Sequence, residues 1–228
     1  MKQNWHDLLF AHWEVAAEQV RRLVPDSLDL DLFGGKAYVA VAPFHMSGIR
    51  ARALPALPGL RRFPELNVRT YVRYRGIPGV YFFSLDAANL AAVWSARAAY
   101  GLPYFHAEMS SRSSGETIEY SSRRRQAGLS GQSPAEFRGR YRPVSEPKQR
   151  EKDSLEYFLT ERYSLYAFRR GKLLRACIHH LPWPLQDAEA EIEVNTMTIA
   201  SGIELPPSNP LLHFSRFLEV LIWKAERC

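Results

Sequence analysis

The feature that most constrains the fold is a strict alternation of side chains along residues 65–74. Glu65, Asn67 and Arg69 occupy every second position, and apolar residues or threonine occupy the positions between them. Successive side chains of a β-strand point to opposite faces of a sheet, so this alternation predicts a strand with one polar and one apolar face. A sheet-based fold is therefore expected.

Further strands and a few short helices are predicted along the chain. Helical spacing marks residues 16–24 and 87–100, and Gly101 is placed to end the second helix. Alternating segments on either side of turns predict three hairpins, at residues 28–48, 105–124 and 158–185. A short helix and a final apolar segment are expected at residues 195–201 and 212–225. We expect one α+β domain over residues 1–228, dominated by antiparallel strands that close on themselves, with an exposed polar excursion around residues 125–152.

The composition restricts the class of protein. A chain of 228 residues with 46% hydrophobic and 24% charged residues can build one sizeable core. No uninterrupted apolar run approaches the roughly 20 residues that a membrane helix needs. The N-terminal segment lacks the charged start, apolar centre and cleavage site of a signal peptide, so a cytoplasmic location is expected.

The net charge of +6 comes from arginine, with 24 Arg against six Lys. Arginine binds phosphate groups and stacks on bases, so a nucleic-acid surface is one interpretation. Many of these arginines alternate with apolar or aromatic residues, as the outward face of strands requires. We favour the second interpretation, and nucleic-acid binding is not expected.

Two stretches of the chain resemble a known family. The first reads FPELNVRTYV, GVYFFSLDA and YGLPYF between residues 63 and 105, and the second reads FLTERYSLYAF and IHHLPWPLQDAE between residues 158 and 189. Both are similar to the YqjF-like family, which belongs to the acetoacetate decarboxylase-like superfamily. The opening segment VRRLVPDSLDLDLFGGKAYVAV supports the resemblance. It implies a closed or cone-like antiparallel β-barrel with a few short helices around an internal cavity.

The resemblance also identifies residues that depart from the superfamily pattern. Its known decarboxylases form a Schiff base between a lysine and a β-keto acid, and that lysine and a second one follow a Gly-aromatic-Pro turn. Aligned on the turn at residues 101–103, these positions are Tyr104 and Phe105 here. The position of an arginine before the first helix is Glu14, and a glutamate on a core strand corresponds to Glu65. Without the amine, iminium catalysis at this site is unavailable, so decarboxylation of acetoacetate is not expected.

The candidate site residues each have a functional and a structural interpretation. Glu65 is the candidate catalytic acid or base, with Asn67 and Arg69 as ligand-binding residues if their strand faces a closed interior. If that face meets water, all three are ordinary surface residues. Tyr104 and Phe105 are expected to line the cavity, although Tyr104 is equally compatible with a buried aromatic whose hydroxyl finds a partner.

Glu161 and Arg162 form a second charged group. They are compatible with a ligand clamp, but a structural ion-pair network is favoured. His179 and His180 are adjacent on a predicted strand and would point to opposite faces, so we expect neither a metal site nor another cofactor.

The leading hypothesis is therefore a protein that binds a small organic ligand, of keto or carboxylic acid type, in an internal cavity, with Glu65 available for acid/base chemistry. The alternative is a non-catalytic module that binds or senses a small molecule in the same cavity. A nucleic-acid-binding protein is the least favoured hypothesis. The sequence is compatible with a homo-oligomer and with a monomer.

Overall fold

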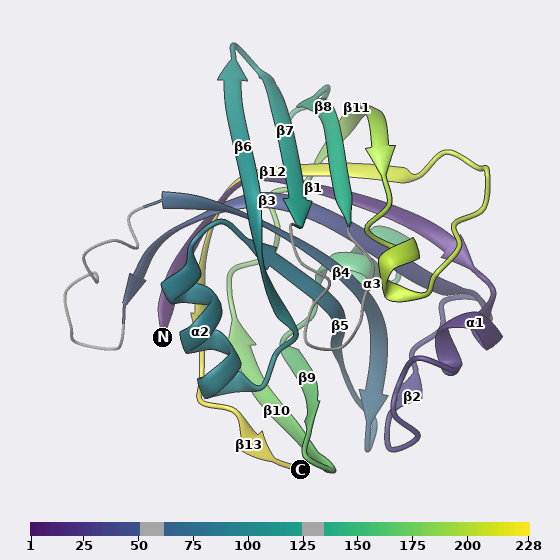
Figure 1. The fold of residues 1–228 in the computed structure, drawn as a ribbon. Coiled ribbons are helices and arrows are strands. Elements are labelled where there is room, and N and C mark those ends of the chain that lie inside the picture. The colour runs from purple at the N-terminus through teal and green to yellow at the C-terminus, as the bar shows by residue number, and fades with distance from the viewer. Residues whose placement is uncertain (51–61, 125–134) are drawn as a thin grey trace.

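A computed structural model describes residues 1–50, 62–124 and 135–228, and Figure 1 shows their arrangement. Most of these residues belong to one sheet, and the helices are few and short. The strands are β1 (Lys2–Val15), β2 (Asp29–Leu30), β3 (Ala37–Arg50), β4 (Arg62–Tyr74), β5 (Ile77–Ala87), β6 (Tyr104–Ser114), β7 (Thr117–Arg124), β8 (Glu136–Pro143), β9 (Ser164–Arg169), β10 (Lys172–His179), β11 (Gln186–Asn195), β12 (Leu211–Ile222) and β13 (Glu226–Arg227). The helices are α1 (Ala17–Arg21), α2 (Leu90–Tyr100), α3 (Leu155–Thr160) and the short 3-10 helix η1 (Ile199–Ser201).

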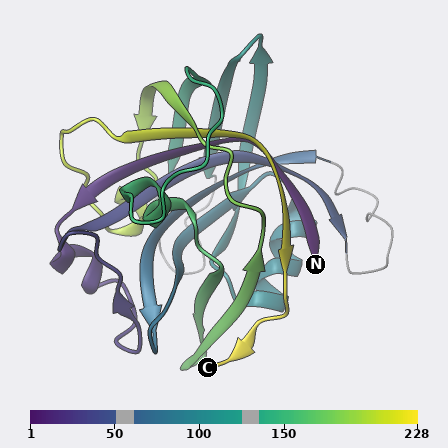
Figure 2. The same ribbon diagram turned by 180° about the vertical axis from the view of Figure 1, so that it is seen from behind.

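Seven of the described strands form a ring through their hydrogen-bonded pairs. In order they are β1, β3, β4, β5, β9, β10 and β12, and β12 pairs again with β1. Only the β5–β9 pair of this ring is parallel. β12 turns as it runs, so that Phe214 lies opposite β11 while Ile222 lies opposite β10 (Figure 2). The predicted fold of mainly antiparallel strands with a few short helices is confirmed at this level.

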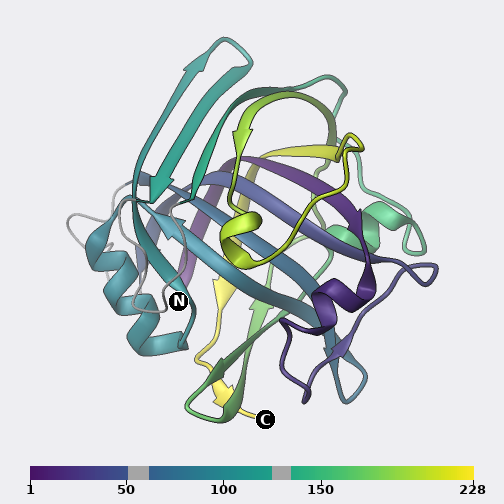
Figure 3. The same ribbon diagram turned by 45° about the vertical axis from the view of Figure 1, so that its right-hand side comes forward.

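A second run of strands leaves the ring at β5 and returns to it at β12. β6 begins in parallel pairing with β5, where Leu85 lies opposite Tyr104, and then pairs antiparallel with β7. β8 and β11 complete the run, and Figures 1 and 3 show these four strands standing above the ring. The first residue of β6 is therefore held against the ring, while its tip lies far from it.

Two clusters of buried apolar side chains cover opposite faces of β4. Phe63 and Tyr71 belong to the first core cluster, which also includes residues of α2 and α3. Leu66 and Val68 belong to the second core cluster, which also includes residues of α1, β7 and β8. The alternation predicted for residues 65–74 is present, but Glu65, Asn67 and Arg69 on the polar face are buried on the side of the first core cluster, and only the end of that face, at Arg73, meets water.

The predicted helix at residues 87–100 is confirmed as α2. Asn89 caps it by accepting a hydrogen bond from the backbone N–H of Ala92 at 3.0 Å. Gly101 ends it in the left-handed conformation, with φ at 68°, which favours glycine. The helix predicted at residues 16–24 is present as the shorter α1. Among the residues described, none of the helices has the length and apolar character needed to cross a membrane.

Two of the three predicted hairpins are confirmed, as β6–β7 and β9–β10. The hairpin predicted at residues 28–48 is wrong in its pairing: the Gly-Gly turn is present, but β2 pairs with β4 instead of β3. Asp31 explains the difference, because its backbone N–H bonds to Tyr71 and its carboxylate pairs with Arg73, also on β4.

Part of the exposed polar excursion predicted around residues 125–152 is a regular strand instead. Residues 125–134 lie outside the described ranges, and β8 occupies residues 136–143 as a regular strand between β7 and β11. Its arginines point outward and pair with glutamates of β11, which accounts for the polar composition.

Other segments also differ from expectation. β1 and β11 were not predicted, and the segment before β9 forms α3 and a connection instead of a strand. The short helix expected at residues 195–201 is reduced to η1, and the final apolar segment is strand β12.

Candidate functional site

Glu65 of β4 and Tyr104 of β6 meet at the wall of a cavity of about 220 Å³. The Tyr104 hydroxyl donates a hydrogen bond to Oε2 of Glu65 at 3.0 Å. Side chains of α2 form part of the cavity wall, and most of the remaining lining is apolar, including Met46, Phe63 and Leu165. The sequence placed Glu65 and Tyr104 in one cavity, and these are the two predicted site residues that the structure brings together.

Hydrogen bonds from neighbouring side chains to the backbone carbonyl oxygens of Glu65 and Tyr104 hold both residues in place. Tyr104 follows the turn after α2, and its carbonyl oxygen accepts a hydrogen bond from Nε of Arg97 at 2.7 Å. The carbonyl oxygen of Glu65 accepts one from the Tyr120 hydroxyl of β7, also at 2.7 Å. The carboxyl–phenol pair is thus supported by two further elements, α2 and β7, which is the kind of rigid support that a binding or catalytic group needs.

Burial sets the protonation of Glu65. Its side chain is 2% exposed, and burial raises the pKa of the Glu65 carboxyl to about 8, against the opposing effect of the Tyr104 hydrogen bond. The nearby carboxylate of Asp86 raises it further. Burial also raises the pKa of Tyr104 well above its usual value, so the phenol keeps its proton. At neutral pH the cavity therefore presents mostly protonated Glu65 beside a neutral phenol.

Asp86 of β5 forms a buried ion pair with Arg124 of β7 behind this site. The Arg124 Nη2 lies 2.6 Å from Oδ1 of Asp86, and both side chains are almost completely buried. Burial raises the pKa of Asp86 to about 6 in spite of the guanidinium. Phe105 was predicted to line the cavity, but its ring stacks under Arg124, with the guanidinium carbon 3.8 Å from the ring centre, and it is not among the cavity-lining residues.

Asn67 and Arg69 lie on the same buried face of β4 as Glu65 but do not line its cavity. The guanidinium carbon of Arg69 lies 5.1 Å from the centre of the Phe10 ring. Oδ1 of Asn67 and Nε of Arg69 have no hydrogen-bond partner within the described part of the chain. The prediction that all three polar residues of this strand converge on one pocket is therefore not reproduced by the geometry.

A buried histidine that the sequence did not identify lies next to Arg69. Nε2 of His12 on β1 is 2.7 Å from the Tyr71 hydroxyl. Burial, followed by the charge of Arg69, holds the pKa of His12 well below its usual value, so the ring is neutral. Recognising His12 would have required predicting β1, whose continuous buried run hides its period.

Glu161 and Arg162 have structural partners away from the cavity. Glu161 lies in the connection after α3 and accepts hydrogen bonds from the Trp183 backbone at 2.8 Å and from the Tyr163 hydroxyl at 2.5 Å. Nη1 of Arg162 lies 2.5 Å from Oδ2 of Asp31. These contacts match the favoured interpretation of a structural network.

All six lysines of the chain lie in the described ranges, and none of them lines the cavity of Glu65. Lys2 pairs with Glu219 across β1 and β12. Lys36 pairs with Glu14 at 2.8 Å, and both side chains are about half exposed. Glu14 is therefore a surface residue.

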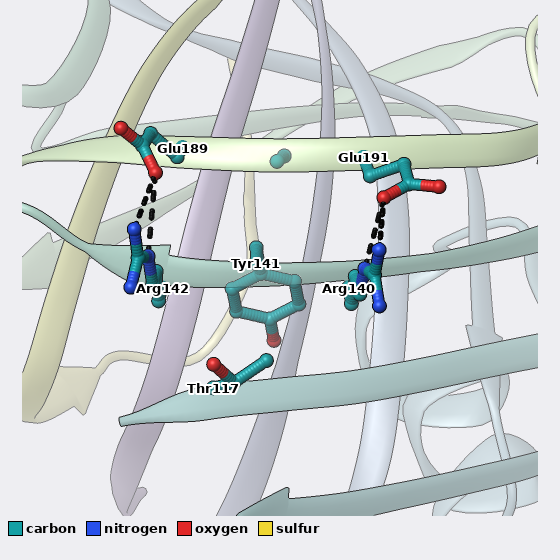
Figure 4. A pocket seen from close by; sticks show the side chains of 7 residues that line it. Thr117, Arg140, Tyr141, Arg142, Glu189 and Glu191 are labelled. Atoms are coloured by element: carbon teal, nitrogen blue, oxygen red, sulfur yellow. Dashed lines mark hydrogen bonds and ion pairs between the residues drawn. The ribbon is translucent and has the colours of Figure 1, made fainter. Parts of the chain in front are cut away.

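The outer face of β8 and β11 carries a ladder of ion pairs (Figure 4). Arg140 lies 2.5 Å from Glu191, and Arg142 lies 2.9 Å from Glu189, at the edge of an open surface pocket. Arg138 pairs with Glu193 in the same way. This arginine cluster thus occupies the outward face of a strand, as favoured from the sequence, and carboxylates neutralise it. No group of three or more potential metal ligands occurs among the described residues.

Comparisons with known proteins place the chain in a family. The model of DUF2071, described as an uncharacterized conserved protein, matches residues 2–219. The "Uncharacterized protein YqjF" of Bacillus subtilis (strain 168) is 52% identical over 223 residues, which cover 98% of this chain and 90% of the relative. The family resemblance predicted from the sequence is confirmed.

Solved structures of other proteins have a fold similar to that of this chain. Acetoacetate decarboxylase from Legionella pneumophila is 12% identical with a TM-score of 0.67, and the match covers 100% of this chain and 86% of that one. The enduracididine biosynthesis enzyme MppR, complexed with pyruvate, is 10% identical with a TM-score of 0.66 over 99% of this chain and 89% of its own. The fold is therefore similar to that of acetoacetate decarboxylase, and the chain belongs to the DUF2071 family.

Proposed function

We propose that this protein binds a small organic ligand of keto or carboxylic acid type in the cavity beside Glu65 and Tyr104, within a cone-like barrel formed by the ring of strands. The observation that carries the proposal is the buried carboxyl–phenol pair in the wall of a mostly apolar cavity. Such pockets, with few polar groups among apolar walls, are typical of small-molecule sites. MppR, which shares the fold, is described in complex with pyruvate, a keto acid.

Glu65 is the group that would exchange a proton with the ligand. Its pKa of about 8 keeps a proton available near neutral pH, and a general acid works best when its pKa is close to the working pH. The Tyr104 hydroxyl orients the carboxyl, so that one oxygen is held and the other is left for the ligand. Asn67, Arg69, Phe105, Glu161 and Arg162 are not assigned to this site, because none of them lines the cavity.

The same proposal includes no Schiff-base chemistry, and it is supported by the absence of lysine among the described residues that line the cavity. Borohydride reduction in the presence of acetoacetate, followed by peptide mass mapping, tests this part. We expect no adduct on any of the six lysines. A stoichiometric adduct on one of them would overturn the exclusion and restore the decarboxylase interpretation.

A thermal-shift screen of small keto and carboxylic compounds tests binding, because a ligand that prefers the folded state raises the melting temperature by mass action. Hits should lose their effect in Ala96→Phe, which places a ring in the cavity, and keep it in Ala98→Phe, on the exposed side of the same helix. Absence of any hit, or hits that survive Ala96→Phe, would contradict the proposed site.

Measuring whether the protein converts the compounds that bind distinguishes an enzyme from a non-catalytic binding module. If hits are converted by the native protein and Glu65→Gln still binds them without conversion, the protein is an enzyme that uses Glu65. If hits bind unchanged, it is a binding or sensing module. Nucleic-acid binding is not proposed, because the arginines of β8 are paired with glutamates.

A further inference from the structure

We infer that Arg69 is the centre of a second internal site, separate from the cavity of Glu65, and that this site binds a small monovalent anion such as a short carboxylate or a halide. Such a site goes beyond the proposed function and does not depend on it. Arg69 lies four residues from Glu65 along β4, and four residues of a strand span roughly 13 Å. Neither Arg69 nor its neighbour His12 lines the cavity of Glu65.

Arg69 differs from the other buried arginines of the molecule. Three arginines are buried among the described residues, namely Arg69, Arg124 and Arg162. Arg124 pairs with Asp86 and Arg162 pairs with Asp31, and both of these carboxylates are buried as well. Each of these two cations therefore has a counter-charge inside the core.

The chain provides no such carboxylate for Arg69. Neither of the two undescribed segments contains Asp or Glu, so all 24 acidic residues lie in the described ranges, and none of them forms an ion pair with Arg69. Arg69 is only 7% exposed, so water has little access to it. A guanidinium keeps its positive charge inside proteins, and a buried charge without a partner is strongly unfavourable. An anion from solution would supply the missing counter-charge.

The groups packed around Arg69 do not compensate its charge. The guanidinium carbon lies 5.1 Å from the centre of the Phe10 ring and 6.0 Å from that of the Tyr71 ring. Ring contacts of this kind orient a guanidinium, but they do not replace a counter-charge. Asp31, whose backbone N–H bonds to the Tyr71 carbonyl oxygen, is already shared by two other arginines.

Three buried nitrogen atoms around His12 have no hydrogen-bond partner within the described part of the chain. They are Nε of Arg69, Nδ1 of His12 and Nδ1 of His213, and the two imidazole rings lie 6.5 Å apart between their centres. Burial, followed by the charge of Arg69, lowers the pKa of His12 well below its usual value, and burial lowers that of His213, so each neutral ring carries one N–H. The Tyr71 hydroxyl can donate to Nε2 of His12 at 2.7 Å, which leaves the proton of that ring on Nδ1. An anion would accept hydrogen bonds from such donors.

The packing restricts the anion to a small ion. Phe10, Tyr71 and His12 pack around the guanidinium, and the His12 ring stacks on Phe10 with 5.8 Å between their centres. One guanidinium balances one negative charge, so a monovalent ion fits best. A carboxylate accepts two parallel hydrogen bonds from the guanidinium fork, so we expect formate to bind more tightly than chloride.

Thermal unfolding of the full chain tests the site, because an anion that binds the folded state raises the melting temperature by mass action. Sodium formate or sodium chloride replaces sodium gluconate, whose anion is too large to enter, at constant ionic strength. The melting temperature of the native protein should rise and saturate, and anion binding should be at least about tenfold weaker in Arg69→Met. Arg140→Met, on the exposed surface, and Ala96→Phe, in the cavity of Glu65, should keep the native response.

Arg69→Met also has an expected effect without a bound anion. In gluconate it should melt at the same temperature as the native protein or above it, since methionine removes a buried charge that has no partner. A clearly lower melting temperature would show that the chain itself compensates the charge, and the anion site would be overturned. Isotope-labelled formate gives a direct readout, because its NMR signal should broaden with the native protein and stay sharp with Arg69→Met.

The outcomes distinguish this site from the cavity of Glu65. If neither formate nor chloride binds the native protein saturably, or if Arg69→Met keeps the native response, the anion site is overturned. If Ala96→Phe abolishes the response while Arg69→Met keeps it, the anion occupies the cavity of Glu65 instead. The ligand screen for that cavity is repeated in Arg69→Met, in which only the cavity contributes hits, so its failure would overturn the proposed function and leave the anion site standing.

Discussion

Glu65 makes the stability of the protein depend on pH. Its pKa is about 8 in the folded chain and near 4.5 in an unfolded one, so between these values the folded state holds a proton that the unfolded state has lost. Stability from this group is full below pH 4.5 and is lost as pH rises to 8, at up to about 1.4 kcal/mol per pH unit. We expect Glu65→Gln, which has no proton to lose, to gain unfolding free energy relative to the native protein as pH rises from 5 to 8.

Chemical unfolding at a series of pH values measures this difference. Glu189→Gln is the matched control, since Glu189 is exposed and pairs with Arg142 on the surface. Asp86, whose pKa is also raised, is present in both proteins, so its contribution cancels in the comparison. A difference that is flat with pH would show that Glu65 titrates near its ordinary pKa.

At the residue scale, the sequence named Glu65 and Tyr104 as separate candidates for one cavity, and the structure brings these two together but not their neighbours Asn67, Arg69 and Phe105. Alternation put Glu65 on one face of a strand, and the superfamily resemblance pointed to the turn before Tyr104. The same resemblance pointed to Phe105, but consecutive strand residues face opposite sides of a sheet, so Tyr104 and Phe105 cannot line one cavity. Arg69 shares the face of Glu65, but it lies too far along the strand to share the cavity.

At the scale of elements, the ion pairs of the upper strands fall into two classes. Arg124 of β7 and Asp86 of β5 are buried, whereas Arg140 of β8 and Glu191 of β11 are about 60% exposed. Removing one partner of a buried pair leaves an uncompensated charge and costs about 3–5 kcal/mol, whereas an exposed pair contributes about 0–1 kcal/mol. We expect Arg124→Met to destabilise the protein strongly and Arg140→Met to have little effect, as measured by denaturant unfolding.

A double variant distinguishes the cost of leaving a buried charge unpaired from the cost of lost side-chain packing. Arg124→Met combined with Asp86→Leu removes both charges, and it should recover a large part of the loss because apolar residues can replace a buried pair at little cost. Equal effects of the two arginine variants, or no recovery in the double variant, would show that the Asp86–Arg124 pair is not electrostatically important.

The strands that the sequence failed to predict have two causes: β8 and β11 pair with partners distant in the chain, and β1 lacks an alternating pattern. β8 looks like an exposed loop because its outward arginines are polar, and their glutamate partners lie about fifty residues later on β11. β1 is buried along most of its length, so the alternation that reveals β4 is absent, and the positive φ of Asp7 interrupts its register. The β6–β7 and β9–β10 hairpins were predictable because both partners are close in sequence.

At the scale of the whole molecule, the ring ties the two core clusters together. Every strand of the ring contributes residues to both clusters, and on β4 the two sets alternate along one backbone. Unfolding one cluster would therefore disrupt strands whose other face packs in the second cluster. This architecture predicts that the described residues unfold as one cooperative unit, and the single domain expected over residues 1–228 stays a prediction.

Two matched truncations test this cooperativity, one in each cluster. Leu85→Ala opens the first core cluster and Leu66→Ala the second, and both leucines are at most 2% exposed, so each change should cost about 2–5 kcal/mol. Native-state hydrogen exchange reports the opening free energy of individual amides. We expect each variant to lower the protection of the slowest amides in both clusters by the same amount, because both report global unfolding. If Leu85→Ala weakened only the first cluster and Leu66→Ala only the second, the chain would consist of two independently unfolding units, and the ring would not couple them.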